Sequence, residues 1–266
     1  MNIKNLKTIT VLAVLLAISL AAVSIGGAFL PRTYERETAS IAAQGAGQDL
    51  VDLFLVVPLL LLSLVFLLKK GRRALFVFGG TVFYILYSFV IYAFGVHFNA
   101  MFFLYCATLG LSLYLFILVM IEGGRMEVET WFGPGTPLRP VGGYLILVAV
   151  MFYFLWLKDT LPAVLGGSLP KTVSDNDFLV NPVHVLDMAV ALPGLFITAL
   201  LLLRKKRLGY ILAPTALVFT VILAVALAGM VLTVQARGIS EDASVAVIFV
   251  VLAVTSAVLL MLFLKK

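Results

Sequence analysis

The stretch QDLVDLFLVVPLLLLSLVFLLKKGRR, residues 48–73, decides the fold class of this 266-residue chain. From Val56 to Leu68 it carries no charge, and a basic turn follows at Lys69. A hydrocarbon core about 30 Å thick needs about 20 apolar residues in a helix, so the stretch predicts a membrane-spanning helix that ends at a charged surface. The strands of a membrane barrel are segments of about ten residues with alternating polarity, and this run excludes them.

The rest of the chain has the same character. It is 63% hydrophobic and 12% charged, whereas a soluble domain is about 25% charged, so a soluble enzyme is excluded. Its mean hydropathy of +1.16 is as high as eight membrane-spanning segments would require. We therefore predict an all-α, polytopic integral membrane protein. The predicted spans lie near residues 8–30, 50–68, 74–96, 100–121, 141–157, 183–203, 209–234 and 246–264.

Two of these spans have an alternative interpretation. Lys4 and Lys7 before the first apolar run resemble the start of a signal peptide, but we expect this helix to be retained, because the repeat described below requires it. Lys158 and Asp159 interrupt the fifth run early. That span is therefore either short or continues towards Gly166.

The basic residues predict the orientation of the chain. With an inside N-terminus, most of the 19 basic residues and few of the 13 acidic ones fall on one side, which the positive-inside rule makes cytoplasmic. We therefore expect an inner (cytoplasmic) membrane protein with both termini cytoplasmic. We expect no nucleic-acid binding, because no exposed basic and aromatic surface is evident. The basic residues on this side are Lys4, Lys7, Lys69, Lys70, Arg72, Arg73, Arg125, Arg139, Arg204, Lys205, Lys206, Arg207, Lys265 and Lys266.

The opening stretch recurs 135 residues later as NPVHVLDMAVALPGLFITALLLLRKKR, residues 181–207. The matched pairs are Asp52 with Asp187, Pro58 with Pro193, Leu60 with Leu195, Leu67 and Leu68 with Leu202 and Leu203, Lys70 with Lys205, and Arg72 with Arg207. We expect two four-helix repeats, residues 1–121 and 141–266, joined by a cytoplasmic Gly/Pro-rich linker at 122–140. Because four is even, the repeats enter the membrane from the same side, related by an axis along its normal.

The outer ends of the second and sixth spans carry the candidate site. Asn181 and Pro182 are typical of the N-cap and the first position of a helix. His184 and Asp187 follow, three residues apart on one face of that helix. Asp49 and Asp52 stand at the matching height of the first copy. If the copies face each other, these four side chains could bind a divalent metal, another cation, a proton or a small solute. Acidic residues are also favoured in the first turns of helices, so a purely structural role stays open.

Polar and aromatic residues nearby are expected to line a pocket. They are Tyr84, Tyr87, Asn181, His97 and Asn99. Tyr34, Glu35, Asp175 and Asp177 could contribute from the loops at 31–48 and 158–181. Pro58 and Pro193 are expected to kink their helices. A haem held by His97 and His184 is not expected, because there is no Cys-x-x-Cys-His site and Cys106 is the only cysteine.

Several segments together resemble an uncharacterised prokaryotic multi-pass membrane family. They are NPVHVLDMAVALP (181–193), GYILAP (209–214), QDLVDLFLVVPLL (48–60) and HFNAMFFLYCATLGLSLYLF (97–116). The resemblance implies only that these segments form a recurring unit, and it assigns no role to any residue.

Three functions are compatible with the sequence. The first is binding of a cation, proton or small solute between the repeats, for transport. The second is an accessory, sensory or assembly subunit with a membrane protein partner or a second copy of the chain. The third is a metal-dependent hydrolase that acts on lipid with the same Asp and His residues. We favour the first and expect that the protein is not an enzyme.

Overall fold

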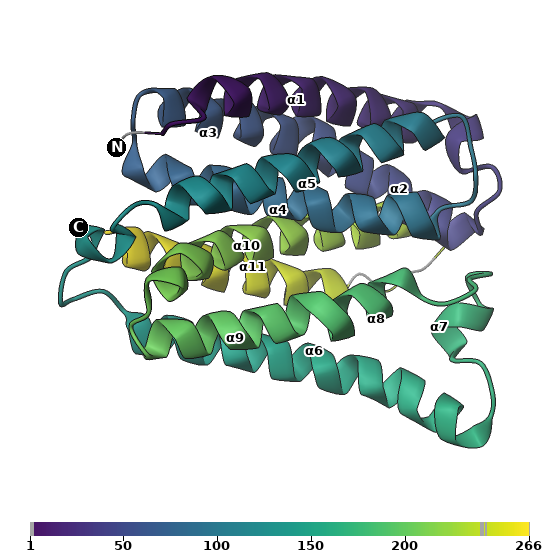
Figure 1. Ribbon diagram of the computed structural model, residues 1–266. Coiled ribbons are helices and arrows are strands. Elements are labelled where there is room, and N and C mark those ends of the chain that lie inside the picture. Colours follow the sequence, from purple (N-terminus) through teal and green to yellow (C-terminus); the bar gives the residue numbers. More distant parts are fainter. Residues whose placement is uncertain (1–2, 240–241, 243, 266) are drawn as a thin grey trace.

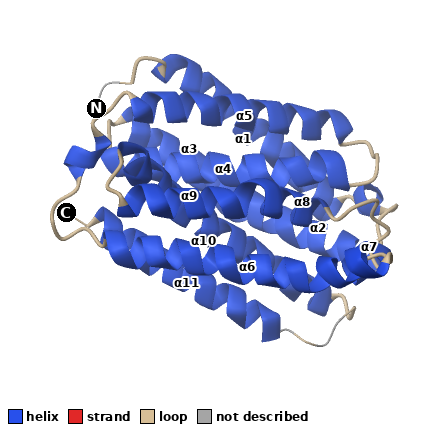
Figure 2. Ribbon diagram, turned by 60° about the horizontal axis from the view of Figure 1, so that its bottom comes forward, coloured by secondary structure: helices blue, strands red, loops and turns tan. Residues whose placement is uncertain are grey.

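The computed structural model describes residues 3–239, 242 and 244–265, and every regular element in these ranges is helical (Figures 1 and 2). Lys266, one of the predicted cytoplasmic basic residues, lies outside them. Eight helical rods in the described ranges are long and apolar enough to cross a membrane, so the predicted number of candidate spans is confirmed.

In chain order the rods are α1 (Leu6–Phe29), α2 (Ala39–Val51) continued by η2 (Asp52–Val56) and α3 (Val57–Leu68), α4 (Arg72–Gly95), α5 (Phe102–Gly124), α6 (Leu138–Gly166), α8 (Pro182–Leu186) continued by η4 (Asp187–Ala191) and α9 (Leu192–Leu203), α10 (Arg207–Ala236) and α11 (Ser244–Leu264). Three shorter elements, η1 (Pro31–Tyr34), η3 (Val128–Trp131) and α7 (Lys171–Ser174), lie in the connections.

The second rod begins at Ala39, so the expectation of a loop at 31–48 is wrong for most of that segment. Thr38 caps the helix by accepting a hydrogen bond from the backbone N–H of Ile41. Small residues then bring α2 close to α10: a Cβ atom added at Gly47 would lie 2.8 Å from the carbonyl oxygen of Gly229. Helix α2 is stabilised by close backbone packing of small residues and not by large apolar side chains. Hydropathy therefore did not predict it.

The fifth rod, α6, takes the longer of its two predicted forms. It continues through Lys158 and Asp159 to Gly166. Gly167, with φ of 63°, then ends it in the left-handed conformation that favours glycine. Thr172 donates a hydrogen bond to Asp159, which ties the connection after α6 back to the helix.

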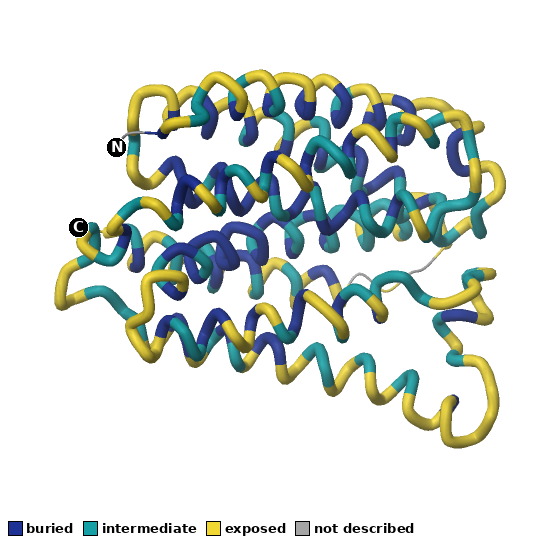
Figure 3. Tube along the Cα trace, in the orientation of Figure 1, coloured by how far each residue is buried: buried dark blue, intermediate teal, exposed yellow. Residues whose placement is uncertain are grey.

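Helices α4 and α10 form the centre of the bundle. They cross closely at Gly80, which has no Cβ atom: a Cβ atom added there would lie 2.6 Å from the carbonyl oxygen of Thr215. Buried residues are most numerous on these two helices, whereas α6 and α11 are largely exposed at the periphery (Figure 3). Helix α2 packs on α10, and α8 packs on α4. The second and sixth rods therefore each contact the central helix of the other half of the chain.

The two ends of the bundle differ in composition. One end, which we call the basic end, carries the turns at Lys69–Gly71 and Arg204–Lys206 together with both termini (Figure 1). The opposite end, which we call the site end, carries the connections 30–38, 96–101 and 167–181 (Figure 1).

The segment between α5 and α6 packs against the basic end. Its η3 turn places Trp131 against the ring of Phe76, and Phe132 lies against Phe263. Glu122, at the end of α5, is buried and accepts hydrogen bonds from the backbone N–H of Lys4 and the side chain of Asn5. These contacts hold the linker and the start of α1 together.

Candidate functional site

Asp52 and Asp187 each begin a five-residue π-helical segment, η2 and η4. In both cases a proline follows as the second residue of the next α-helix, Pro58 in α3 and Pro193 in α9. Proline lacks the backbone N–H that would continue the α-helical ladder, and a π-helical turn holds an extra residue that redirects neighbouring side chains. Pro58 and Pro193 were expected to kink their helices. Each follows a π-helical segment, and the helical rod continues through both elements.

Asp49 is buried beside the first of these segments and holds two tyrosines. It accepts hydrogen bonds from the hydroxyl of Tyr34 at 2.5 Å and from that of Tyr92 at 3.3 Å. Gly27 on α1 gives this cluster its space, because a Cβ atom there would overlap both Asp49 and Tyr34. Burial, and next the neighbouring Asp49 carboxyl, raise the pKa of Tyr34, so this tyrosine stays neutral and donates.

The other two carboxyls lie on either side of a pair of tyrosines on α4. Tyr84 donates a hydrogen bond to Asp52, and Tyr87 donates one to Asp187, each at 2.8 Å. Residues three apart on a helix lie on neighbouring positions of its surface, so α4 joins the two carboxyls through adjacent side chains. Tyr84 and Tyr87 were expected to line a pocket, but they instead hold the carboxyls from within the core.

His184 is buried, at 3% exposure, but neither of its ring nitrogens has a hydrogen-bond partner in the described part of the protein. Its ring lies against that of Trp156, with 4.4 Å between the ring centroids. Trp156 in turn donates its indole N–H to Asp187 at 2.8 Å. Asn181 caps α8 as predicted, accepting from the backbone N–H groups of Val183 and His184.

These residues surround a cavity of about 360 Å³ near the site end, which we call the cavity. Its walls come from η1, α2, α4, α6, α10 and the 172–184 segment, so both halves of the chain contribute. The side chains with polar groups are Tyr34, Gln44, Gln48, Tyr92, Trp156, Thr172, Asn176, Asn181 and His184. Asp49, Asp52 and Asp187 do not line it and form a layer behind its wall, which we call the carboxyl layer. Tyr34, Tyr92 and Trp156 connect the two, because each lines the cavity and donates to a carboxyl.

The four predicted site residues are thus buried near one cavity, but they do not form a metal centre. No group of three or more His, Cys, Asp or Glu side chains is placed to hold a metal ion within the described ranges. Asp52 and Asp187 are held by different tyrosines of α4, and His184 faces Trp156. Three carboxylates and one imidazole thus do not meet at one point in the described structure: Tyr84 donates to Asp52, and Tyr87 and Trp156 donate to Asp187.

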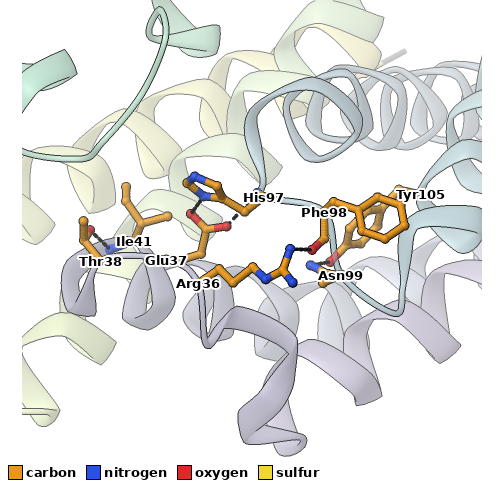
Figure 4. A network of polar contacts seen from close by, with 8 residues as sticks. All are labelled: Arg36, Glu37, Thr38, Ile41, His97, Phe98, Asn99 and Tyr105. Carbon is orange, nitrogen blue, oxygen red and sulfur yellow. Dashed lines mark hydrogen bonds and ion pairs between the residues drawn. The ribbon is translucent and has the colours of Figure 1, made fainter.

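His97 and Asn99 belong to a different network, which connects the loops of the site end (Figure 4). Glu37 accepts hydrogen bonds from the backbone N–H of His97 at 2.7 Å and contacts its Nδ1 at 3.1 Å. Arg36 donates to the carbonyl oxygen of Phe98, and Asn99 donates to Tyr105 (Figure 4). Neither His97 nor Asn99 lines the cavity, and the same holds for Glu35, Asp175 and Asp177.

Sequence reasoning missed Trp156 and Tyr92 as site residues. Trp156 is one of only two tryptophans, and Tyr92 follows Tyr84 by about two helical turns. The rarity of tryptophan and the spacing of the tyrosines are weak signals in a chain with so many aromatic residues. Each points to a site only when the carboxyl that accepts the hydrogen bond is known.

No protein-family model, curated protein or solved structure matches this chain.

Proposed function

We propose that the chain is an internal duplication of four helices, residues 1–121 and 141–266, with 122–140 as the linker. The sequence match at an offset of 135 residues is supported by the two π-helical segments, which begin at Asp52 and Asp187 and have the same length. The left-handed residues Lys70 and Lys205 are also separated by this offset. The cavity then lies between the two copies.

We propose further that the cavity binds a small polar solute or a monovalent cation, and that the protein transports it. The observation that carries this proposal is His184: its two ring nitrogens have no hydrogen-bond partner among the described residues and are buried in the wall of a cavity lined by hydrogen-bonding groups. A buried polar group without a partner costs about 1–3 kcal/mol, and a bound solute would remove that cost. The volume of about 360 Å³ falls in the range of small-molecule sites, which is about 300–1,000 Å³.

The carboxyl layer favours neutral or cationic solutes over anions. Asp49, Asp52 and Asp187 lie behind the wall, and none of the described residues that line the cavity is Lys or Arg. The hydrolase alternative loses its basis, because the described residues offer no three-ligand group for a catalytic metal. By the positive-inside rule, the basic end faces the cytoplasm and the cavity opens to the outside.

Cysteine labelling tests the outward opening of the cavity. Cys106→Ser removes the only cysteine, and Gln44→Cys then places one in the cavity wall. We expect a membrane-impermeant maleimide to label Gln44→Cys in intact cells, whereas Lys69→Cys, at the basic end, is labelled only after permeabilisation. No labelling of Gln44→Cys from outside, with labelling of Lys69→Cys, would contradict the proposed orientation.

Thermal unfolding of the purified protein tests binding. We expect at least one member of a panel of sugars, amino acids, polyamines and monovalent salts to raise the unfolding temperature of the wild type. The same compound should not stabilise His184→Phe, which keeps an aromatic ring against Trp156 but removes both ring nitrogens. Equal stabilisation of the two proteins would contradict a role for His184.

A further inference from the structure

A second hollow, which we call the groove, adjoins the cavity between α4 and the rod formed by α8 and η4. Its volume is about 560 Å³, and apolar side chains dominate its lining. The main apolar residues are Val90, Phe94, Leu179, Val185, Leu186, Ala189 and Val190. Phe94 is 79% exposed, although it lies within a candidate membrane span. The groove therefore opens towards the hydrocarbon at the side of the bundle.

The groove and the cavity share part of their walls. Gly95, Val96, Phe178 and Pro182 line both. Gly95 is required at this boundary, because a Cβ atom there would lie 2.5 Å from the side chain of Pro182. This contact is part of the wall between the two hollows, so a ligand that spans both passes beside it, with one part among polar groups and the other among apolar side chains.

We infer that the ligand of the cavity is a membrane amphiphile whose neutral, zwitterionic or cationic head occupies the cavity while its hydrocarbon chain lies in the groove. This inference rests on the proposed solute site and names the chemical class of the solute. A water-soluble head-group analogue would fill the cavity but leave the groove empty, whereas the chain of an amphiphile can pass from the bilayer into the groove at little cost, because both surroundings are equally apolar.

The charges around both hollows select the head group. None of the described lining residues of either hollow is Lys or Arg, whereas the carboxyl layer lies behind the cavity and Asp177 lines the groove. His97 also lines the groove, but its ring contacts Glu37. An anionic head group would therefore meet acidic groups without a compensating Lys or Arg. An ammonium or hydroxyl head group can instead donate a hydrogen bond to the ring nitrogen of His184 that carries no proton, and an ammonium group can also lie over the ring of Trp156.

Lipid retention tests the inference. The protein is reconstituted in vesicles of equal amounts of phosphatidylethanolamine and phosphatidylglycerol, extracted gently and examined by native mass spectrometry. We expect wild type to retain phosphatidylethanolamine over phosphatidylglycerol. Ala189→Phe, which fills the groove, should lower the retained phosphatidylethanolamine severalfold, because its ring takes the place of the lipid chain and the chain loses its packing contacts. Val247→Phe, on the exposed face of α11, is the matched control and should retain lipid as wild type does.

A second measurement separates failure of this inference from failure of the solute site. Trp131→Phe leaves Trp156 as the only tryptophan, and acrylamide quenching then reports access to the cavity from water. Equal lipid retention by wild type and Ala189→Phe, or a preference for phosphatidylglycerol, overturns the inference. If acrylamide still quenches Trp156 in that case, the cavity takes a solute from water instead. If neither lipid nor acrylamide reaches Trp156, the solute site is overturned as well. Should Ala189→Phe not fold, Val190→Phe fills the same groove.

Discussion

Asp52 and Asp187 occupy the same position in two π-helical segments, the first residue of each, and each accepts a hydrogen bond from a tyrosine of α4. The two carboxyls belong to rods from different halves of the chain. Helix α4 therefore holds together the two segments that shape the cavity, and its tyrosines are structural partners of the carboxyl layer.

The pairing of Asp52 with Tyr84 should be measurable as a coupling. Asp52→Ala leaves the buried Tyr84 hydroxyl without its acceptor, so we expect the free energy of unfolding to fall by about 1–3 kcal/mol. Tyr84→Phe in addition should cost little more, because the partner is already lost. Denaturant unfolding of the two single variants and the double variant measures this. Asp175→Ala, at an exposed position, should change little, and additive losses in the cycle would contradict the pairing.

Glycine substitutions test the packing around Asp49. Gly27→Ala forces a methyl group into the space of Asp49 and Tyr34, so we expect a loss of several kcal/mol or failure to fold. Gly110→Ala is the matched control, because nothing lies within 4 Å of its added Cβ atom and alanine favours a helix over glycine by up to about 1 kcal/mol. Thermal unfolding should therefore separate the two variants in opposite directions. Equal behaviour would show that α1 does not lie against Asp49.

His184 should behave as a functional rather than a stabilising residue. Its ring nitrogens bond to no described group, so His184→Phe should leave the unfolding temperature unchanged or raise it, while ligand-dependent stabilisation disappears. Asn99→Ala is the comparison: it removes the hydrogen bond to Tyr105 and should lower stability by about 1 kcal/mol without affecting ligand binding, because Asn99 lines neither the cavity nor the groove. A large loss of stability in His184→Phe would mean that the imidazole has a structural partner.

The buried hydroxyl of Tyr34 should make the protein sensitive to high pH. Burial and Asp49 raise the pKa of Tyr34 above the ordinary value of 10.0, so above about pH 10 the unfolded state loses this proton before the folded state does. Stability from this group is complete below the unfolded pKa and falls as pH rises through it. Unfolding measured from pH 9 to pH 11, in steps of about half a unit, should show a shallower decline for Tyr34→Phe than for wild type. An identical decline would place Tyr34 in contact with water.

The eight long apolar helices were predictable, because long apolar runs have few structural alternatives in a chain of this composition. The cap at Asn181 was predictable for a local reason, since the residue and its partners are adjacent in sequence. Helix α2 was not predicted, because its alanines and glycines support it through contact with α10. The division of the carboxyls by Tyr84 and Tyr87 also depends on tertiary packing, and no sequence spacing encodes which hydroxyl each carboxyl accepts from.

The central claim, that the cavity beside His184 is a ligand site, is tested most directly by an experimental density map of the protein in a lipid bilayer. The account predicts non-protein density in the cavity within hydrogen-bonding distance of a His184 ring nitrogen. A map in which protein side chains fill the cavity, and in which both His184 nitrogens bond to them, would contradict it.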